Sequence, residues 1–277
     1  MSTNPSVDMA SLKQWAQTLR LDVLDITTKY GGHLTSCFSC VEILTVLYFG
    51  HILRYRAAEP HWAERDRFIL SKGHAAPLLY SVLARAGYFP LARLSEFRQV
   101  HSGLHGHPIQ DAAPGVEVSA GSLGQGLSFG LGHVLAGRLQ RLDFRVYVLL
   151  GDGECEEGQV WEAAMAAAHF RADRLTAIVD FNKLQQTGPI AQEMALEPFA
   201  EKWRAFGWHV LEADGHDVAD VAAKLKAAQV VAGRPQVVLA HTIKGKGVSF
   251  IENDHTMHGR ALSGEKVERA RKEIACA

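Results

Sequence analysis

Two polar side chains thirty residues apart have the chemistry of a metal-binding pair. Asp152 lies in GDGE, directly after the apolar run 145–150, and Asn182 follows the apolar run 175–181. If both runs are strands of a parallel sheet, a right-handed crossover brings their carboxyl ends to the same edge. There a carboxylate and an amide oxygen can share Mg²⁺, which prefers oxygen ligands and usually keeps phosphates and water as the others. The spacing therefore predicts a magnesium–diphosphate site.

The glycines beside Asp152 fit this interpretation, although a structural one exists. Gly151 and Gly153 allow the backbone to approach a ligand closely, and the Gly153 N–H can face an anion at the start of the following helix. In the alternative, Asp152 simply caps that helix and Asn182 lies in a turn, because caps of this kind are common. Spacing alone leaves both interpretations open.

Histidines gather at glycine-rich turns. Among the fourteen histidines, His33, His74, His107 and His258 lie in GGH, KGH, HGHP and MHG. Imidazoles exchange protons near neutral pH and hydrogen-bond to hydroxyl groups. Each histidine taken alone is a structural residue in the simplest interpretation, but the shared setting favours a common site.

Other patterns have simpler explanations than the motifs they imitate. Cys37 and Cys40 form a single CxxC, whereas a zinc site needs a second pair of ligands, so we expect both to pack as small apolar residues on a helix beginning at Ser36. A redox role is the alternative, although no strand precedes the motif. GQGLSFG imitates a dinucleotide fingerprint, but no strand enters it directly. Lys244 and Lys246 are suited to phosphate, and a solvated loop is an equal alternative.

Apolar periodicity predicts the elements that position these residues. Strands alternate with helices, which indicates a doubly wound α/β fold: a parallel sheet flanked by helices, in a single domain over residues 1–277. A long loop at 101–118 is typical of a functional segment. KVERARKEI, near the C-terminus, predicts an amphipathic surface or interface helix. The expected strands are 67–70, 145–150, 175–181, 208–213 and 236–241, and the expected helices are 11–29, 36–50, 75–86, 91–100, 122–142, 159–170, 198–206 and 218–232.

Composition narrows the class of protein. The formal net charge is −1, so no broad positive field favours nucleic acid or an anionic membrane. No apolar run is long enough to span a bilayer, and the first ten residues lack the apolar core of a signal peptide. We expect a cytoplasmic protein with neither nucleic acid nor membrane as a partner.

An ordered set of motifs resembles the transketolase family. The resemblance covers about residues 10–260, and it agrees with the predicted metal–diphosphate site. The motifs are GGH, SKGHAAPLLY, GLHGHP, SAGSLGQGLSFGLG, GDGECEEGQVWEA, DFNKLQQTG, DGHD and TIKGKGVSFIENDHTMHG. The family transfers a two-carbon ketol unit between sugars with thiamine diphosphate, so the resemblance implies this fold, this cofactor and Mg²⁺.

The resemblance also implies roles for individual residues. Asp152, the Asn182 side chain and the Leu184 carbonyl would hold Mg²⁺, while His74 and Gly153 would contact the diphosphate. Gly121 and Leu123 would contact the aminopyrimidine, and the donor sugar would be faced by His33, His107 and His258. Glu157 would lie at an interface that links paired active sites across a two-fold axis.

Two features depart from the family pattern. Met257 precedes His258 where the family often has tryptophan. Full transketolases also continue into a pyrimidine-binding and a C-terminal domain, which carry the activating glutamate and most groups that hold the sugar phosphate. We therefore expect a partner chain that supplies these domains, two copies of each chain, and no activity without the partner. The donor is a ketose phosphate by resemblance, or a branched or sulfonated sugar.

Three other functions share some of these features. A 2-oxo acid dehydrogenase alpha-type subunit has the metal motif and needs a second chain, but HGHP and SKGH disfavour it. A 1-deoxyxylulose-phosphate-synthase-like enzyme usually lacks HGHP. A non-catalytic homologue would keep the fold without the chemistry, and intact Asp152, Asn182 and histidines argue against it.

Overall fold

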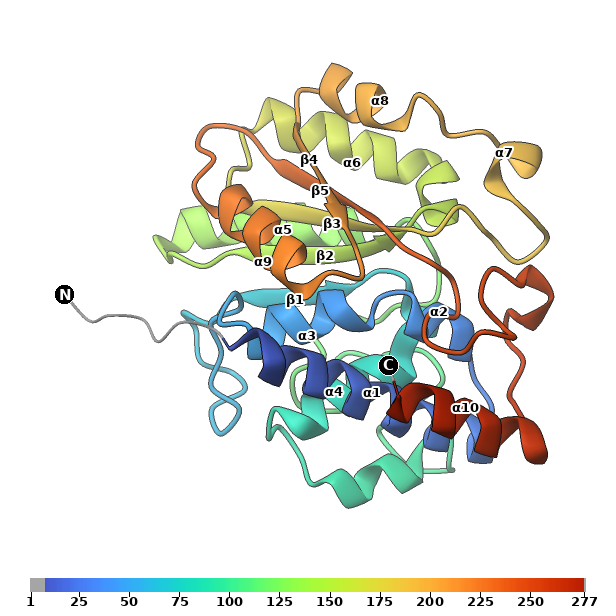
Figure 1. The fold of residues 1–277 in the computed structure, drawn as a ribbon. Helices are drawn as coiled ribbons and strands as arrows, with labels where there is room; N and C mark the ends of the chain where they lie inside the picture. Colours follow the sequence, from blue (N-terminus) through green and yellow to red (C-terminus); the bar gives the residue numbers. More distant parts are fainter. Residues whose placement is uncertain (1–7, 277) are drawn as a thin grey trace.

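A single parallel sheet forms the centre of the molecule (Figure 1). The structure, a computed structural model, describes residues 8–276. Its five strands have the order β1-β2-β3-β5-β4, and every neighbouring pair is parallel. The predicted parallel α/β fold is therefore confirmed. The strands are β1 (Arg67–Leu70), β2 (Val146–Gly151), β3 (Leu175–Phe181), β4 (His209–Asp214) and β5 (Gln236–His241).

Helices cover both faces because the central strands are apolar on both sides. Along β2, Tyr147 and Leu149 pack into one core, and Val146 and Val148 pack into the other. The first core contains α1 (Met9–Tyr30), α2 (Leu34–Phe38), α3 (Val41–Phe49), α4 (Ala76–Arg85), α9 (Val218–Gln229) and α10 (Glu265–Ala275). The second contains α5 (Gly126–Gln140), α6 (Gly158–His169), α7 (Ile190–Glu193) and α8 (Phe199–Ala205).

The predicted helix 36–50 is wrong, because the chain forms two helices there. α2 ends at Phe38 and α3 begins at Val41. The Ser39 hydroxyl donates to the Ser36 carbonyl and to Asp180 of β3, and such side-chain bonds compete with the helical ladder. Cys37 thus lies on α2 and Cys40 lies in the turn before α3, but both are fully buried and unpaired, as small apolar residues are. Burial raises the pKa of Cys37 to about 12, which disfavours a reactive thiolate.

Two other predicted helices begin or end elsewhere. Residues 91–100 form only a short 3-10 helix, η2 (Leu91–Glu96), and Arg98 has a positive φ of 58° that ends helical geometry. The helix predicted from Ser122 begins at Gly126. The N–H groups of Gly124 and Gly126 instead donate to Glu154 and Ser71, so this stretch is an irregular loop against the sheet edge.

The rest of the prediction agrees with the structure to within a few residues, and residues 101–118 form the expected loop. Within residues 8–276, no helix is long and apolar enough to cross a membrane. The amphipathic C-terminal helix exists as α10, and it packs on α1. Short elements that were not predicted are η1 (Gly73–Ala75), η3 (Gly153–Glu156), η4 (His255–Met257) and α7.

Candidate active site

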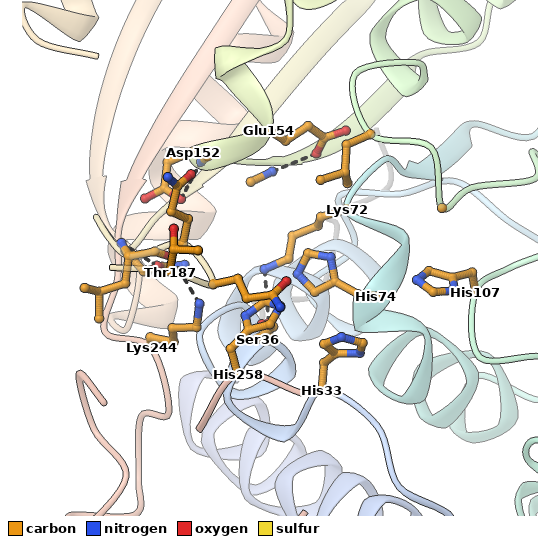
Figure 2. A pocket seen from close by; sticks show the side chains of 18 residues that line it. His33, Ser36, Lys72, His74, His107, Asp152, Glu154, Thr187, Lys244 and His258 are labelled. Carbon is orange, nitrogen blue, oxygen red and sulfur yellow. Dashed lines mark hydrogen bonds between the residues drawn. The ribbon is translucent and has the colours of Figure 1, made fainter. Parts of the chain in front are cut away.

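A pocket of about 380 Å³ opens at the carboxyl ends of β1, β2 and β3 (Figure 2). Open parallel sheets bind ligands at this edge. Ten of the eleven predicted site residues line it, from seven separate stretches of the chain. These ten are His33, His74, His107, Gly121, Leu123, Asp152, Gly153, Asn182, Leu184 and His258.

The turn after β1 can lie this close to the 119–124 loop because Gly73 has no side chain. A Cβ on Gly73 would stand 2.9 Å from the Gly121 backbone nitrogen, which is nearer than a Cβ comes to a non-bonded atom in proteins. His74 follows on η1 and lies beside His33 and His258 in the pocket. The glycine of SKGH therefore brings His74 and the Gly121 backbone to one wall.

Asp152 is a buried carboxylate without an ion pair in the described part of the chain. Its side chain is 3% exposed, and its oxygens accept hydrogen bonds from the Gly153 N–H, at 2.8 Å, and from the Lys183 N–H. Burial and the neighbouring Asp180 raise its pKa to about 7. Asp152 does cap η3, as the structural interpretation proposed, but one cap does not offset the burial of a charge. A bound cation would satisfy such a carboxylate.

The other two predicted metal ligands lie beside it. The Asn182 oxygen accepts from the Leu184 N–H at 3.1 Å, and its amide nitrogen donates to Asp180 at 3.3 Å, so the amide is held in one orientation. The Leu184 carbonyl accepts from the Lys244 ammonium at 3.1 Å. A cationic group thus already contacts one of the predicted ligands. The donor set of carboxylate, amide and carbonyl oxygens fits a hard cation.

Lys244 is not in a solvated loop. Its side chain is buried, and burial together with nearby Lys72 lowers its pKa to about 8. It points into the pocket in Figure 2, so the phosphate-binding alternative fits its position. Lys246, by contrast, is partly exposed and lies 3.9 Å from Glu252.

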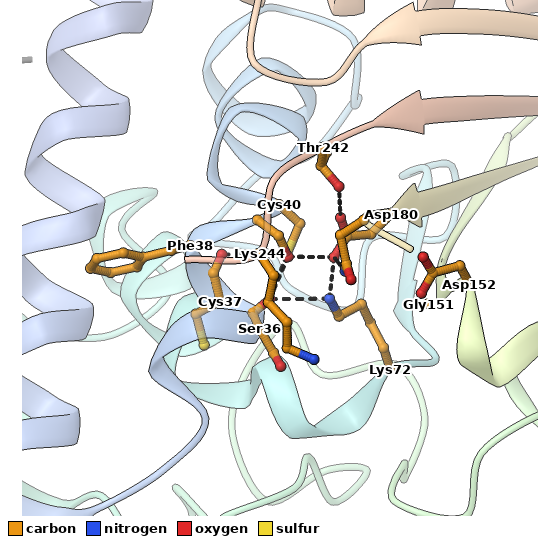
Figure 3. A network of polar contacts seen from close by, with 12 residues as sticks. Ser36, Cys37, Phe38, Cys40, Lys72, Gly151, Asp152, Asp180, Thr242 and Lys244 are labelled. Atoms are coloured by element: carbon orange, nitrogen blue, oxygen red, sulfur yellow. Dashed lines mark hydrogen bonds and ion pairs between the residues drawn. The ribbon is translucent and has the colours of Figure 1, made fainter. Parts of the chain in front are cut away.

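A buried ion pair beneath the pocket was not predicted (Figure 3). The Lys72 ammonium, from the turn after β1, contacts Asp180 of β3, and both side chains are almost fully buried. Asp180 also accepts from the hydroxyl groups of Ser39 and Thr242. Burial alone would lower the pKa of Lys72, but Asp180 outweighs this and raises it, so the pair stays charged. An aspartate within the apolar run LTAIVDF was the available signal, because a buried charge needs a partner.

Four histidines line one side of the pocket. The ring centroid of His33 lies 5.2 Å from that of His74, 5.1 Å from His258 and 6.3 Å from His107. Burial lowers the pKa of His33 to about 4 and that of His258 to about 3. Both rings are thus neutral near pH 7, with one donor and one acceptor each. Both rings line the pocket and are only partly buried, although their Nδ1 atoms are buried and have no hydrogen-bond partner within residues 8–276.

Several other lining residues were missed by sequence reasoning. Glu154 is buried and accepts from the Gly151 and Gly124 N–H groups, both at 3.0 Å, so it joins the β2 end to the 119–124 loop. The second acid of GDGE was its only signal. The others are Ser36, Lys72, Gln185, Gln186 and Thr187.

Glu157 does not line the pocket. It is exposed at the N-terminus of α6. Its Cβ lies close to the Gly124 backbone, because a Cβ added at Gly124 would stand only 2.8 Å from the Glu157 Cβ. Its predicted place at a subunit interface remains a prediction.

Comparison with known proteins identifies the family. Residues 11–276 match the family described as "Transketolase, thiamine diphosphate binding domain". The chain belongs to the transketolase family. It is 41% identical to the transketolase of Pongo abelii over 268 residues, which are 96% of this chain and 42% of that relative. The chain thus spans about two fifths of the curated transketolase that it matches.

A shorter relative matches over nearly its whole length. The 6-deoxy-6-sulfo-D-fructose transketolase subunit SqwG of Clostridium sp. (strain MSTE9) is 39% identical over 270 residues, which are 97% of this chain and 98% of the relative. Among solved structures, transketolase from Leishmania mexicana superimposes with a TM-score of 0.90 at 30% identity, over 97% of this chain and 42% of that one. The fold is therefore that of the transketolase thiamine-diphosphate domain.

Proposed function

We propose that this chain is the diphosphate-binding subunit of a two-chain transketolase, which transfers a two-carbon ketol unit from a ketose to an aldose. The observation that carries the proposal is the convergence of ten predicted residues from seven stretches of sequence in one pocket. Membership of the transketolase family supports it. So does the match, over 98% of its length, to a relative that is itself named a subunit.

Mg²⁺ and thiamine diphosphate fit the pocket as its cofactors. Asp152, the Asn182 oxygen and the Leu184 carbonyl would hold the metal, because the first is a buried carboxylate that forms no ion pair within residues 8–276. His74, the Gly153 N–H and the Lys244 ammonium would contact the diphosphate, and Gly121 with Leu123 would face the aminopyrimidine. When bound, the cofactor supplies the chemistry that breaks and forms the carbon–carbon bond.

The histidines are suited to the sugar. His33 and His258 are neutral, are only partly buried and line the pocket, so they can bind hydroxyl groups of the donor. His107 is exposed, at the outer side of the cluster. It can accept or return a proton at a sugar hydroxyl near neutral pH, and it can select donors that present that hydroxyl.

A partner chain would complete the site. Full-length relatives extend well beyond the matched region, which is 42% of the Pongo abelii protein. The exposed side chains of α5 and α6 include Phe129 and Met165, and Glu157 is exposed at the N-terminus of α6. Such a surface is typical of an interface. We place the partner there, with two copies of each chain, since closed two-fold assemblies are the commonest.

The donor is an anionic ketose in this proposal. The relative named for 6-deoxy-6-sulfo-D-fructose supports a sulfonated sugar as one candidate. Ordinary ketose phosphates and branched sugars are the others, because the groups reading the far end of the sugar would lie in the partner. A 2-oxo acid dehydrogenase or 1-deoxyxylulose-phosphate synthase activity is disfavoured by membership of the transketolase family.

Co-expression tests the proposal. This chain is produced with and without the product of the neighbouring open reading frame, and ketol transfer is screened with sulfonated, branched and phosphorylated ketoses. We expect transfer only when both chains, Mg²⁺ and thiamine diphosphate are present. Cofactor-dependent transfer by this chain alone would contradict the two-chain proposal, and its absence with every donor would contradict the activity.

A further inference from the structure

Residues 242–258, the segment that leaves β5, bring two side chains to the pocket and have little regular structure of their own. Lys244 enters near the start and His258 at the end, and between them only η4 is a defined element. A buried ammonium on an irregular segment needs that segment to be held in place. The contacts that hold it come from outside the pocket.

His216, in the DGHD turn between β4 and α9, contacts the segment directly. Its Nε2 accepts a hydrogen bond from the Ile243 N–H at 2.8 Å. Because an N–H donates to Nε2, the ring proton is on Nδ1, which lies 3.1 Å from a Glu42 carboxylate oxygen. The His216 side chain is 12% exposed, so water does not readily replace either contact.

The preceding glycine makes this approach possible. A Cβ on Gly215 would stand 2.3 Å from the Thr242 side chain and 2.9 Å from the His241 carbonyl. The Gly215 N–H also donates to that carbonyl at 2.8 Å. The turn therefore packs backbone to backbone against the end of β5, and this places the imidazole beside Ile243.

Glu42 and Arg20 extend the contact to the far side of Lys244. The two form a buried ion pair at 2.7 Å between α1 and α3. The Arg20 Nε donates to the Lys246 carbonyl at 3.0 Å. The segment is thus bound at Ile243 and at Lys246, on both sides of Lys244.

We infer that His216 is a positioning residue: with Glu42 and Arg20 it forms a latch that holds residues 243–246, so that Lys244 reaches the pocket. None of the three lines the pocket, so they act through the backbone of the segment. Loss of the Nε2 acceptor would free the Ile243 amide and let the segment move away from Leu184. The catalytic part of this inference rests on the proposed function, but the structural part does not.

Three variants of the full-length chain, co-expressed with its partner, test the latch. H216L removes both ring nitrogens, whereas H216Q keeps an acceptor near the position of Nε2. H241L is the matched control, because His241 also pairs with a glutamate, Glu212, at 3.0 Å near the same strand end but is 42% exposed. Amide hydrogen exchange of residues 242–258 and titration with Mg²⁺ and thiamine diphosphate are measured, with kcat and KM.

We expect H216L to raise exchange at Ile243 at least tenfold and to weaken cofactor binding by a similar factor, which is about 1.4 kcal/mol. H216Q should recover most of both losses, and H241L should change neither. Should H216L not fold, H216N takes its place, because its shorter amide can reach Glu42 but not the Ile243 N–H, and it should raise exchange at Ile243 in the same way.

Three results would overturn the latch: unchanged exchange at Ile243 in H216L, an equal rise over the whole chain, or no recovery in H216Q. Exchange is measured without cofactor or sugar, so it is independent of activity. Raised exchange in H216L, together with no ketol transfer by the unmodified complex, would support the latch and contradict the proposed function instead.

Discussion

Asp152→Asn should stabilise the chain without its cofactors and weaken cofactor binding. The carboxylate is 3% exposed, and its pKa is raised from 3.8 to about 7 by burial and by Asp180. A raised pKa in the fold means that the stabilising contribution is complete below pH 3.8 and is lost as the pH rises to about 7. Asparagine has no charge to bury, so it avoids that loss.

The size of this stability difference follows from how steeply the free energy of unfolding depends on pH. Each pH unit between the two pKa values changes the free energy of unfolding by about 1.4 kcal/mol. Two of these units lie between pH 5 and pH 7, so D152N should gain roughly 3 kcal/mol relative to the unmodified chain between pH 5 and pH 8. The cost of leaving one of the two N–H groups without an acceptor is about 1–3 kcal/mol, and it is the same at both pH values.

Urea unfolding at pH 5 and pH 8 measures this difference. The measurement is repeated at pH 8 with saturating Mg²⁺ and thiamine diphosphate. There the unmodified chain should be more stable than D152N, because only the carboxylate is a strong metal ligand. Cofactor affinity of the mutant should fall at least tenfold, about 1.4 kcal/mol or more. A stability difference that does not change with pH would show that Asp152 is already ionised and satisfied without a metal, and the argument from its burial would be wrong.

Substitutions at three other residues should each change a different measured quantity: turnover, the free energy of unfolding, or assembly with the partner. H107A should lower kcat for the preferred donor roughly tenfold, the loss of about one hydrogen bond, with cofactor affinity unchanged in titration; equal kcat and KM would make His107 structural. K72M should cost about 3–5 kcal/mol in urea unfolding, because Asp180 is left buried and unpaired, and a loss under 1 kcal/mol would contradict the pair. E157A should weaken assembly with the partner about tenfold in light scattering at low concentration, without changing cofactor binding to the assembled complex.

The arrangement of strands and the main site residues were predictable because both follow from local rules. Apolar runs of four to seven residues, with helical periods between them, specify parallel strands, and glycine-rich turns mark the ends where ligands bind. Asp152 and Asn182 could be paired from spacing because one strand–helix–strand unit separates them. Ten predicted residues therefore lie in one pocket.

The rest depends on contacts between distant segments, which periodicity does not encode. Ser39 interrupts the predicted helix 36–50 partly because its hydroxyl reaches Asp180 on β3. Lys72 and Asp180 are 108 residues apart, and only the assembled sheet edge brings them together. For Lys244 the sequence leaves phosphate binding and a solvated loop as equal alternatives, and only the packing of residues 243–246 against distant segments shows that its side chain is buried. Each of these is a polar group whose partner is unknown until the fold exists.

These buried charges together explain how the pocket can exist without a cofactor and still bind one. Lys72 and Asp180 neutralise each other permanently. Asp152 and Lys244 do not form a pair, and burial shifts the pKa of the first up to about 7 and that of the second down to about 8, toward their neutral forms. A metal cation favours the ionised Asp152, and a diphosphate favours the ammonium form of Lys244. Near pH 7 Lys244 is therefore still mostly an ammonium, whereas Asp152 is only partly ionised. A metal–diphosphate complex, which carries charges of both signs, would favour full ionisation of both residues.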